Sequence, residues 1–564
     1  MKNKTLYLIV ALGWMLGFAS CDKEYYPSDE QSSEVLMEES PSTIMDGCYA
    51  LLKDEIEYLG WPSGNTYCRH YFQMAEFPAD NICLSGKSTD PLFQATTYTM
   101  TDNLQNVGTL WMVGYKIIYM ANALIASLDE NDDKSRQIIG EAYFMRALIH
   151  FNIVTLYAKP YMLAKSTNNL GVPLRTDITS TEVKRDPVTE VYEQVVKDLK
   201  KAAELMEPGK ERGNAGYANH DAALGLLSRV YLYMERYNDC INTVNEMLGG
   251  ATAASKLDAN LATYFANAKT SKETLFCIAH EATEDRVQSS IGSMYSSEGG
   301  GWGEIYPSVP LLYLYERYPD DVRYTAFIHP QYEEGEPSTQ LKVYLPKGEP
   351  DSEARRDVAS FNVNYDSLTG LYSFKTKGVT YTIENRLIQG EYTEYHVNYK
   401  GEDLVVRIEP DNIKTRNTYL RYFVSKFGGQ DGSPTLSSPV VLRWAEVILN
   451  RAEAYARLGN NDDKALDDVN AIRMRAGIPD EGKFSTTNMH GYSSVIDVVM
   501  DERRLELAFE GHRMFDVYRN KMDMDRHYPG LQSWTTMKYT DPRIQYPIPN
   551  AEWTVSHIEQ NPGY

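Results

Sequence analysis

Residues 222–248 have the sequence Ala-Ala-Leu-Gly-Leu-Leu-Ser-Arg-Val-Tyr-Leu-Tyr-Met-Glu-Arg-Tyr-Asn-Asp-Cys-Ile-Asn-Thr-Val-Asn-Glu-Met-Leu and predict two helices joined by a two-residue turn. Apolar side chains recur every three to four positions on both sides of Glu235-Arg236, which is the period of a helix with one buried face. The small residues Ala222 and Gly225 stand where two helices would touch, and Tyr231 would fill the gap beside them. This pair predicts a mostly helical protein.

Further helices are expected at the same period along the chain. They are predicted over residues 42–56, 111–128, 137–157, 187–206, 441–458 and 464–475. The last two turn at Gly459-Asn460. Their small residues and tyrosine repeat the pattern of the first pair at Ala452, Ala454, Tyr455 and Ala465. Such contacts resemble tetratricopeptide helix hairpins, but the repeats are degenerate and far apart. The sequence therefore predicts a scaffold of helix pairs rather than a regular array.

Residues 332–427 have a different pattern. Segments such as Tyr372-Ser-Phe-Lys-Thr-Lys, Val379-Thr-Tyr-Thr-Ile and Tyr392–Tyr399 alternate and are rich in β-formers. A long stretch rich in Gly, Pro, Asn and aromatics, residues 60–106, predicts irregular loops, and Asp541–Tyr564 predicts an extended tail. The expected fold class is mostly α: a tetratricopeptide-like helical-pair scaffold with irregular loops and a β-rich insertion.

Composition limits the partners. The 564 residues contain 56 Lys and Arg against 78 Asp and Glu, a net charge of −22. A phosphate polymer is repelled by such a field unless a basic patch offsets it, and the sequence contains no such patch. Nucleic acid is therefore excluded. Tyrosine, at 42 residues, far exceeds the 16 phenylalanines, which favours aromatic side chains on surfaces and grooves as well as in the core.

The N-terminus has the three parts of a secretory signal peptide over residues 1–20. Lys2 and Lys4 form a short basic start, Leu6–Phe18 is an apolar run too short to span a membrane, and Ala19-Ser20 is a small-residue site. The next residue, Cys21, completes a pattern that resembles the lipobox of bacterial lipoproteins, with Cys21 as the lipidated residue. An ordinary signal peptide followed by a chance cysteine is the alternative.

The five remaining cysteines have no metal-site spacing, and their odd number leaves at least one unpaired. A Cys68–Cys83 disulfide is one interpretation for an exported protein. Isolated buried thiols are the other, and they are favoured because a chain of this length has enough core without cross-links.

Several long motifs, in order, resemble the SusD/RagB-type outer-membrane nutrient-binding lipoproteins of Bacteroidota. They are Gly140-Glu-Ala-Tyr-Phe-Met-Arg-Ala-Leu-Ile-His-Phe-Asn-Ile-Val, Pro307-Ser-Val-Pro with Asp321-Val-Arg, Val441-Leu-Arg-Trp-Ala-Glu-Val-Ile-Leu-Asn-Arg-Ala-Glu-Ala-Tyr, Asp468-Val-Asn-Ala-Ile-Arg-Met-Arg-Ala-Gly, Glu502-Arg-Arg-Leu-Glu-Leu-Ala-Phe-Glu-Gly-His-Arg-Met-Phe-Asp, Tyr546-Pro-Ile-Pro and Asn561-Pro-Gly-Tyr. Lys23-Glu24 is similar to the short charged signal for the outer face of the outer membrane. Met514 stands where Trp is common, and the β-rich insertion is longer than expected.

The resemblance implies a lipid-anchored protein at the cell surface, in the outer membrane, with a SusC-like TonB-dependent transporter as partner. It implies three parts: the signal peptide, a lipidated tether over residues 21–40, and a single SusD-like body over residues 41–564 with the insertion around 332–427. It also implies capture of oligosaccharides or polysaccharides, and in some members peptides, for import.

Two carboxylates on one helix suggest an alternative, a hydrolase. Glu502 and Glu506 lie on the apolar stripe of the segment Val495–Phe509, and a glycosidase needs two carboxyls about 5–10 Å apart. Buried acids paired with arginines are the favoured interpretation, because an unpaired buried charge is very costly. The same interpretation covers Glu141 with Arg146, and Glu446 and Glu453 with Arg443 and Arg451.

No other catalytic or cofactor motif is present. The ten histidines include no i, i+4 pair, and Gly299-Gly-Gly-Trp-Gly303 lacks the lysine of a phosphate-binding loop. We therefore expect no catalytic residue, no metal site and no cofactor. Asp320 and Asp321 suggest a supporting calcium ion, but a solvated turn is favoured, since calcium needs about six to eight oxygen ligands.

The Gly299–Gly303 loop instead offers an aromatic platform. Sugar rings present apolar C–H faces on which aromatic planes stack, while polar groups bind the hydroxyls. Trp302, with Tyr295, Tyr306 and Glu304, is the first candidate glycan-binding wall, and it lies where the resemblance would place ligand aromatics. A loop tryptophan folded onto the scaffold is the alternative.

A second candidate wall is the irregular stretch after residue 60. Its candidate contacts are Trp61, Asn65, Tyr67, Arg69, Tyr71, Asp80, Asn81 and Lys87. Trp61 has no helical stripe to account for it, and the stretch resembles the region where family members contribute polar ligand contacts. For the polar residues, stabilising turns is the alternative.

The sequence thus favours a surface lipoprotein that captures a glycan without cleaving it and passes it to a transporter. A peptide-capturing lipoprotein of the same architecture and, less favoured, a glycoside hydrolase are the alternatives.

Overall fold

The computed structural model describes residues 40–564 except 59–60, 65, 87–89, 166–168, 180–182, 211, 350–351 and 389–391. The chain divides into two units, Met1–Ile44 and Met45–Tyr564, and the second carries every element from α4 onward. The predicted signal peptide, Cys21 and all but the last residue of the predicted tether lie outside the described residues.

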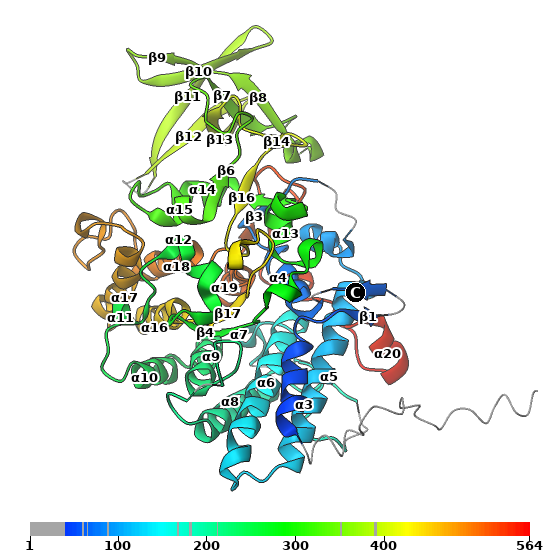
Figure 1. The fold of residues 1–564 in the computed structure, drawn as a ribbon. Helices are drawn as coiled ribbons and strands as arrows, with labels where there is room; N and C mark the ends of the chain where they lie inside the picture. Colours follow the sequence, from blue (N-terminus) through cyan, green and yellow to red (C-terminus); the bar gives the residue numbers. More distant parts are fainter. Residues whose placement is uncertain are drawn as a thin grey trace, which may run out of the picture. The chain divides into compact units, whose positions relative to one another are not determined.

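Long helices form the scaffold (Figure 1). They are α5 (Gln105–Ser127), α6 (Asp133–Tyr157), α8 (Val188–Leu205), α9 (His220–Tyr233), α10 (Tyr237–Leu248), α16 (Trp444–Leu458), α17 (Asp462–Arg475) and α18 (Val495–Glu506). Each packs on the next, with α10 against α16 across the whole intervening sequence. The predicted helix pairs are confirmed.

The first pair shows why its small residues matter. Asn219 caps α9, and its side chain accepts a hydrogen bond from the Ala222 amide at 2.8 Å. Gly225 faces the strand pair β4 (Thr274–Cys277) and β17 (Val440–Arg443), where an added Cβ would lie 2.8 Å from a methyl of Leu442. Any larger residue would therefore push the helix off the strands, and glycine permits the close approach.

Several predicted elements were wrong. The helix expected over residues 42–56 ends at Ala50. The stretch 60–106, expected as irregular loops, contains helix α4 (Thr66–Glu76), and the tail expected as extended contains helix α20 (Asn550–Ser556). The helix expected from residue 441 begins at Trp444, because Val440–Arg443 forms strand β17 and pairs with β4 (Thr274–Cys277). This long-range pairing overrides the local helical period, since it places Val440 and Leu442 in the core and satisfies their backbone groups.

Short elements connect the scaffold. The helices are α3 (Pro41–Ala50), α4 (Thr66–Glu76), α7 (Tyr161–Ala164), α11 (Ala253–Lys256), α12 (Leu261–Tyr264), α13 (Gly292–Tyr295), α14 (Val309–Tyr315), α15 (Val322–Phe327), α19 (Arg513–Arg519) and α20 (Asn550–Ser556), with 3-10 turns that include η2 (Phe265–Thr270), η4 (Val287–Ser289), η5 (Glu298–Gly300) and η7 (Gln430–Gly432). Antiparallel strand pairs are β1 (Ile56–Tyr58) with β2 (Trp61–Ser63), β3 (Ile82–Leu84) with β5 (Ile305–Pro307), β6 (Ile328–Pro330) with β16 (Tyr422–Val424), β14 (Thr415–Arg416) with β15 (Tyr419–Leu420), and β18 (Met524–Asp525) with β19 (Thr536–Met537).

The β-rich insertion is a seven-stranded antiparallel sheet, at the top of Figure 1. Its spatial order is β8 (Val358–Asn362), β7 (Leu341–Pro346), β13 (Glu402–Pro410), β12 (Tyr392–Tyr399), β11 (Val379–Ile388), β10 (Leu371–Thr376), β9 (Asn364–Asp366). Phe361 on β8 stacks on Phe374 on β10, with ring centroids 4.9 Å apart. The sheet must curl for these distant strands to meet, and it encloses its own apolar core.

Helix α5 has the length and apolar composition of a membrane-crossing helix, but most of its apolar stretch is buried against α4 and α6. Trp111 lies inside this contact against Tyr157, as predicted for a core residue. The cysteines in the described residues are all buried and unpaired, which confirms the interpretation as isolated thiols and excludes the Cys68–Cys83 disulfide.

Candidate functional site

The two walls predicted from the sequence lie side by side. Strand β3, from the stretch after residue 60, pairs with β5, which follows the Trp302 loop. The Ser85 amide and hydroxyl both donate to the backbone oxygen of Glu304, at 2.9 and 3.0 Å. Residues more than two hundred positions apart in the sequence thus lie next to each other in the fold, and the strands that join them are buried.

Trp302 is exposed on a loop that is held in place. Its side chain is 46% exposed, and its indole nitrogen donates to the Gln288 carbonyl at 3.2 Å. The Trp302 amide donates to the Ser293 carbonyl at 2.7 Å, and the Trp302 carbonyl accepts a hydrogen bond from the Arg416 guanidinium at 2.6 Å. An aromatic face is therefore presented to solvent at little further cost in side-chain entropy, as a stacking platform requires.

The hairpin that carries Trp61 reaches the same surface. An added Cβ on Gly64 would lie 3.1 Å from the side chain of Ser289, the neighbour of the Gln288 that binds Trp302. Trp61 pairs with Tyr58 on β1, and its side chain lies outside the described atoms. Asn65 and Lys87 also lie outside the described residues.

Arg416 and Asn417 hold the two walls in place, and neither is predicted from the sequence. Arg416 forms a 3.0 Å ion pair with Glu304, and the Asn417 amide donates to the Ser85 carbonyl at 2.9 Å. They lie at the turn between β14 and β15, over a hundred residues from the loop they hold, and no local pattern marks them.

Arg69 lies on α4 at the edge of this surface. Its guanidinium is 3.4 Å from a carboxylate oxygen of Asp90 and 3.8 Å from the Met294 sulfur. Arg69 is half-buried, and its contacts with Asp90 and Met294 connect the two walls.

Three predicted tyrosines are not on the surface. Tyr295 is buried between Phe427, on which it stacks at 5.4 Å, and Phe509. Tyr306 is fully buried on β5, and Tyr67 is buried with its hydroxyl accepting a hydrogen bond from Asn152 at 3.2 Å. These rings have no face free to stack on a ligand, so their prediction as glycan contacts was wrong in this structure.

The predictions of Asp80 and Asn81 as glycan contacts were also wrong. Both are buried, and Arg513 binds the Asp80 carboxylate with two hydrogen bonds, at 2.7 and 3.0 Å. The Asn81 side chain accepts from Arg504 at 2.8 Å. Burial raises the pKa of Asp80, but Arg504 and Arg513 outweigh it and hold that pKa well below its usual range. These side chains tie the loop to the C-terminal segment and are not available to a ligand.

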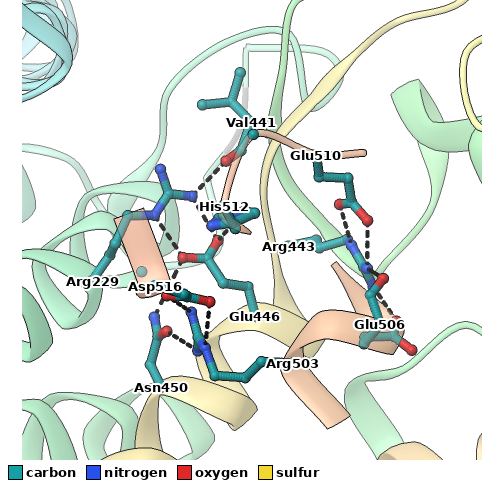
Figure 2. Close-up of polar contacts among 12 residues, drawn as sticks. Arg229, Val441, Arg443, Glu446, Asn450, Arg503, Glu506, Glu510, His512 and Asp516 are labelled. Carbon is teal, nitrogen blue, oxygen red and sulfur yellow. Dashed lines mark hydrogen bonds and ion pairs between the residues drawn. The ribbon is translucent and has the colours of Figure 1, made fainter. Parts of the chain in front are cut away.

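The carboxylates of α18 belong to a buried ion network, of which Figure 2 shows Arg443 with Glu506 and Glu510. Five cationic side chains meet five carboxylates: Arg323, Lys426, Arg443, Arg473 and Arg475 with Glu273, Asp321, Glu502, Glu506 and Glu510. Burial raises the pKa of Glu506, but Arg475, Arg443 and Arg323 outweigh it and lower that pKa far below its usual range. A general acid needs a raised pKa, so this geometry favours structure over catalysis.

Figure 2 shows a second network beside the first. Arg229 binds Glu446 with two hydrogen bonds of 2.6 Å, and Arg503 donates to Asp516 at 3.0 Å. The prediction that buried glutamates pair with arginines is confirmed, but the named partners were wrong. Separately, Glu141 binds Arg212 rather than Arg146.

No calcium site forms at the acidic pair. Asp321 is buried and binds Arg323 at 2.7 Å, while its carboxylate also caps α15. The favoured prediction of a solvated turn was therefore wrong for Asp321, although Asp320 is exposed. In the described part of the chain, no group of three His, Cys, Asp or Glu side chains is placed to hold a metal ion.

Helix pairs that each pack on their neighbours define the class of helical-repeat scaffolds. The chain belongs to the SusD family, whose model matches residues 266–564, more than half of its length. A second family, described as starch-binding associating with outer membrane, matches residues 29–232.

Individual relatives agree. The chain is 25% identical over 492 residues to SusD-like protein P2 of Formosa agariphila, covering 84% of this chain and 83% of that protein. Among solved structures, a SusD superfamily protein from Bacteroides thetaiotaomicron has a TM-score of 0.67 at 22% identity, with 93% of this chain and 99% of that chain covered. A SusD-like carbohydrate binding protein from Bacteroides vulgatus has a TM-score of 0.60 at 16% identity, over 92% and 96% of the two chains. These structures share the fold.

Proposed function

We propose that this protein captures a glycan at the Trp302 surface without cleaving it and passes it to a SusC-like TonB-dependent outer-membrane transporter. The observation that carries the proposal is an exposed indole on a loop fixed by Gln288, Ser293 and Arg416. Membership of the SusD family, and the description of one structural relative as carbohydrate binding, support it.

The non-catalytic part of the proposal rests on the paired carboxylates. Glu502 and Glu506 are buried and held by Arg323, Arg473 and Arg475. A glycosidase acid must give its proton to a leaving group, and the lowered pKa of Glu506 leaves that carboxylate without a proton to give.

Replacing Trp302 by alanine is expected to weaken glycan binding at least tenfold, about 1.4 kcal/mol or more, because the stacking face is lost. The measurement is calorimetric titration of the lipid-free body, from Asp22 onward, against soluble starch, laminarin and galactomannan. Trp553→Ala is the matched control: Trp553 is also exposed, at 39%, but lies on α20 and bonds Asp102.

If Trp302→Ala binds glycan with unchanged affinity, the glycan-binding site is not on this surface. Sugar released over a day of incubation would contradict non-catalytic capture and return Glu502 and Glu506 as candidates. Binding of a casein digest with no glycan binding would favour the peptide-capturing alternative.

The surface location is tested separately. Replacing Cys21 by serine is expected to remove lipidation and release the protein from the outer-membrane fraction, because acyl chains contribute about 0.8 kcal/mol per buried CH₂ to anchoring. Membrane fractionation and surface labelling of whole cells measure this. Retention of the variant in the membrane would show that Cys21 is not the anchor.

A further inference from the structure

A large cleft lies beside the Trp302 loop. Its volume is about 920 Å³, which is in the range of ligand-binding pockets. Segments from α12 and η2, α13 and η5, β6, β16 and the η7 turn form its walls. No residue of the cleft is one of the predicted glycan contacts.

The chemistry of the walls is that of hydroxyl recognition. Polar side chains without a full charge come from several sides, namely Thr263, Asn267, Ser296, Gln331 and Ser425. Backbone is also accessible, because four glycines line the cleft. Side-chain amides and hydroxyls both donate and accept hydrogen bonds, as sugar hydroxyls do.

The wall around η7 is fixed before any ligand binds. An added Cβ on Gly428 would lie 2.2 Å from the Pro434 carbonyl oxygen, so the turn closes tightly on itself. The Asp285 carboxylate accepts hydrogen bonds from Ser433 at 2.6 Å and from Thr435 at 2.9 Å. The buried Gln430 donates to the His280 carbonyl at 2.7 Å. A rigid wall lowers the entropic cost of binding.

The carboxylates that line the cleft are not matched by any lysine or arginine among the described lining residues. Glu298 and Asp431 supply these carboxylates, and both side chains are exposed. His329 also lines the cleft, and burial lowers its pKa, which favours the neutral imidazole at neutral pH. A sulfate or uronate group placed there would therefore meet like charge and no charged partner, which costs binding energy. The net charge of −22 acts in the same direction.

Continuity with the proposed glycan surface comes from one loop. Ser296 and Glu298 line the cleft, while Trp302, four positions after Glu298 on the same loop, is exposed and is not one of the lining residues. The Trp302 and Gly303 amides both donate to the Ser293 carbonyl, which holds the loop in this form.

We propose that this cleft is a second sugar subsite, which takes an uncharged oligosaccharide segment and so restricts the protein to neutral glycans. The inference rests on the proposed function, since it names the class of glycan that the protein captures.

Two substitutions test the cleft directly. Ala262→Trp fills it from α12, and Ala254→Trp on α11 is the matched control, since both alanines are exposed on short helices. Glu298→Arg places a cation in the cleft, and Glu246→Arg on α10 changes the net charge equally at another exposed site. Parent, variants and Trp302→Ala are titrated with soluble starch, laminarin and galactomannan as neutral glycans, and with polygalacturonate and chondroitin sulfate as acidic ones.

The expected result is that the parent binds only neutral glycans, and that Ala262→Trp weakens this binding about tenfold while Ala254→Trp does not. Glu298→Arg is expected to gain measurable affinity for polygalacturonate relative to Glu246→Arg. If Trp302→Ala weakens binding but both cleft variants match their controls, the second subsite is wrong and the glycan-capture function stands. Binding of acidic glycans by the parent would likewise overturn only the subsite. A parent that binds no glycan would overturn the proposed function, and the subsite with it.

Discussion

Replacing Arg443 by alanine is expected to destabilise the folded body by about 3–5 kcal/mol, because it leaves buried carboxylates without their partner. Arg443 is 1% exposed and contacts three acids: Glu273 at 2.8 Å, Glu506 at 2.6 Å and Glu510 at 2.8 Å. It also donates to the Glu506 carbonyl at 2.8 Å. One guanidinium therefore joins the end of β17 to the end of α18 and the segment after it, and alanine would remove all these bonds at once.

Urea unfolding at neutral pH measures the loss. Arg386→Ala is the control, because Arg386 pairs with Glu384 and Asp403 at the exposed surface of the insertion, where such pairs contribute about 0–1 kcal/mol. Arg443→Lys keeps the charge but lacks the planar fork that reaches three acids, so an intermediate loss is expected, measurable even if the alanine variant does not fold. A loss for Arg443→Lys no greater than that for Arg386→Ala would show that the network contributes little to stability.

The scaffold was predictable because its signal is local. The period of apolar residues in 222–248 and the two-residue turn at Glu235-Arg236 give α9 and α10 almost to the residue. The insertion was predictable as strands for the same reason. Its curled sheet was not, because the contact of Phe361 with Phe374 depends on strand order, which alternation along one strand does not contain.

The buried charges show where local reasoning ends. The sequence predicted that Glu446 and Glu453 are paired with arginines, since an unpaired buried charge is too costly. It named neighbours in the sequence as partners, but the partners are Arg229 and Arg519, from α9 and α19. The cost of burying a charge predicts that each glutamate has a cationic partner. Which arginine is the partner depends on how the helices pack, and the local sequence does not show this.

The candidate surface was predictable in part. Trp302 was identified by a tryptophan among glycines, a pattern of exposed loops. Tyr295 was counted with it because of nearness in the chain, yet it faces the opposite way, into the core between Phe427 and Phe509. The sequence predicts Asp80 as a glycan contact, because nothing near it in the chain indicates Arg513 as the partner of its carboxylate.

Glu76 is a buried acid for which this structure gives no full set of partners. It ends α4, is 1% exposed, and accepts one hydrogen bond, from the Gly511 amide at 2.8 Å. Its other oxygen has no hydrogen-bond partner among the described residues. Burial raises the pKa of Glu76 from 4.5 to about 7, against the lowering effects of the Gly511 amide and Lys426.

The contribution of Glu76 to the free energy of unfolding is therefore expected to fall by about 3 kcal/mol between pH 4.5 and pH 8. The folded state holds this proton more tightly than the unfolded state, so the contribution is fully favourable below the unfolded pKa and is lost as pH rises through the folded one. Glu76→Gln stays neutral and can keep the bond to Gly511. Urea unfolding should show the variant gaining about 3 kcal/mol over the parent at pH 8 relative to pH 4.5, while Glu246→Gln, at an exposed site on α10, shows no such change. A variant-to-parent difference that is constant across this range would mean that folding does not raise the pKa of Glu76.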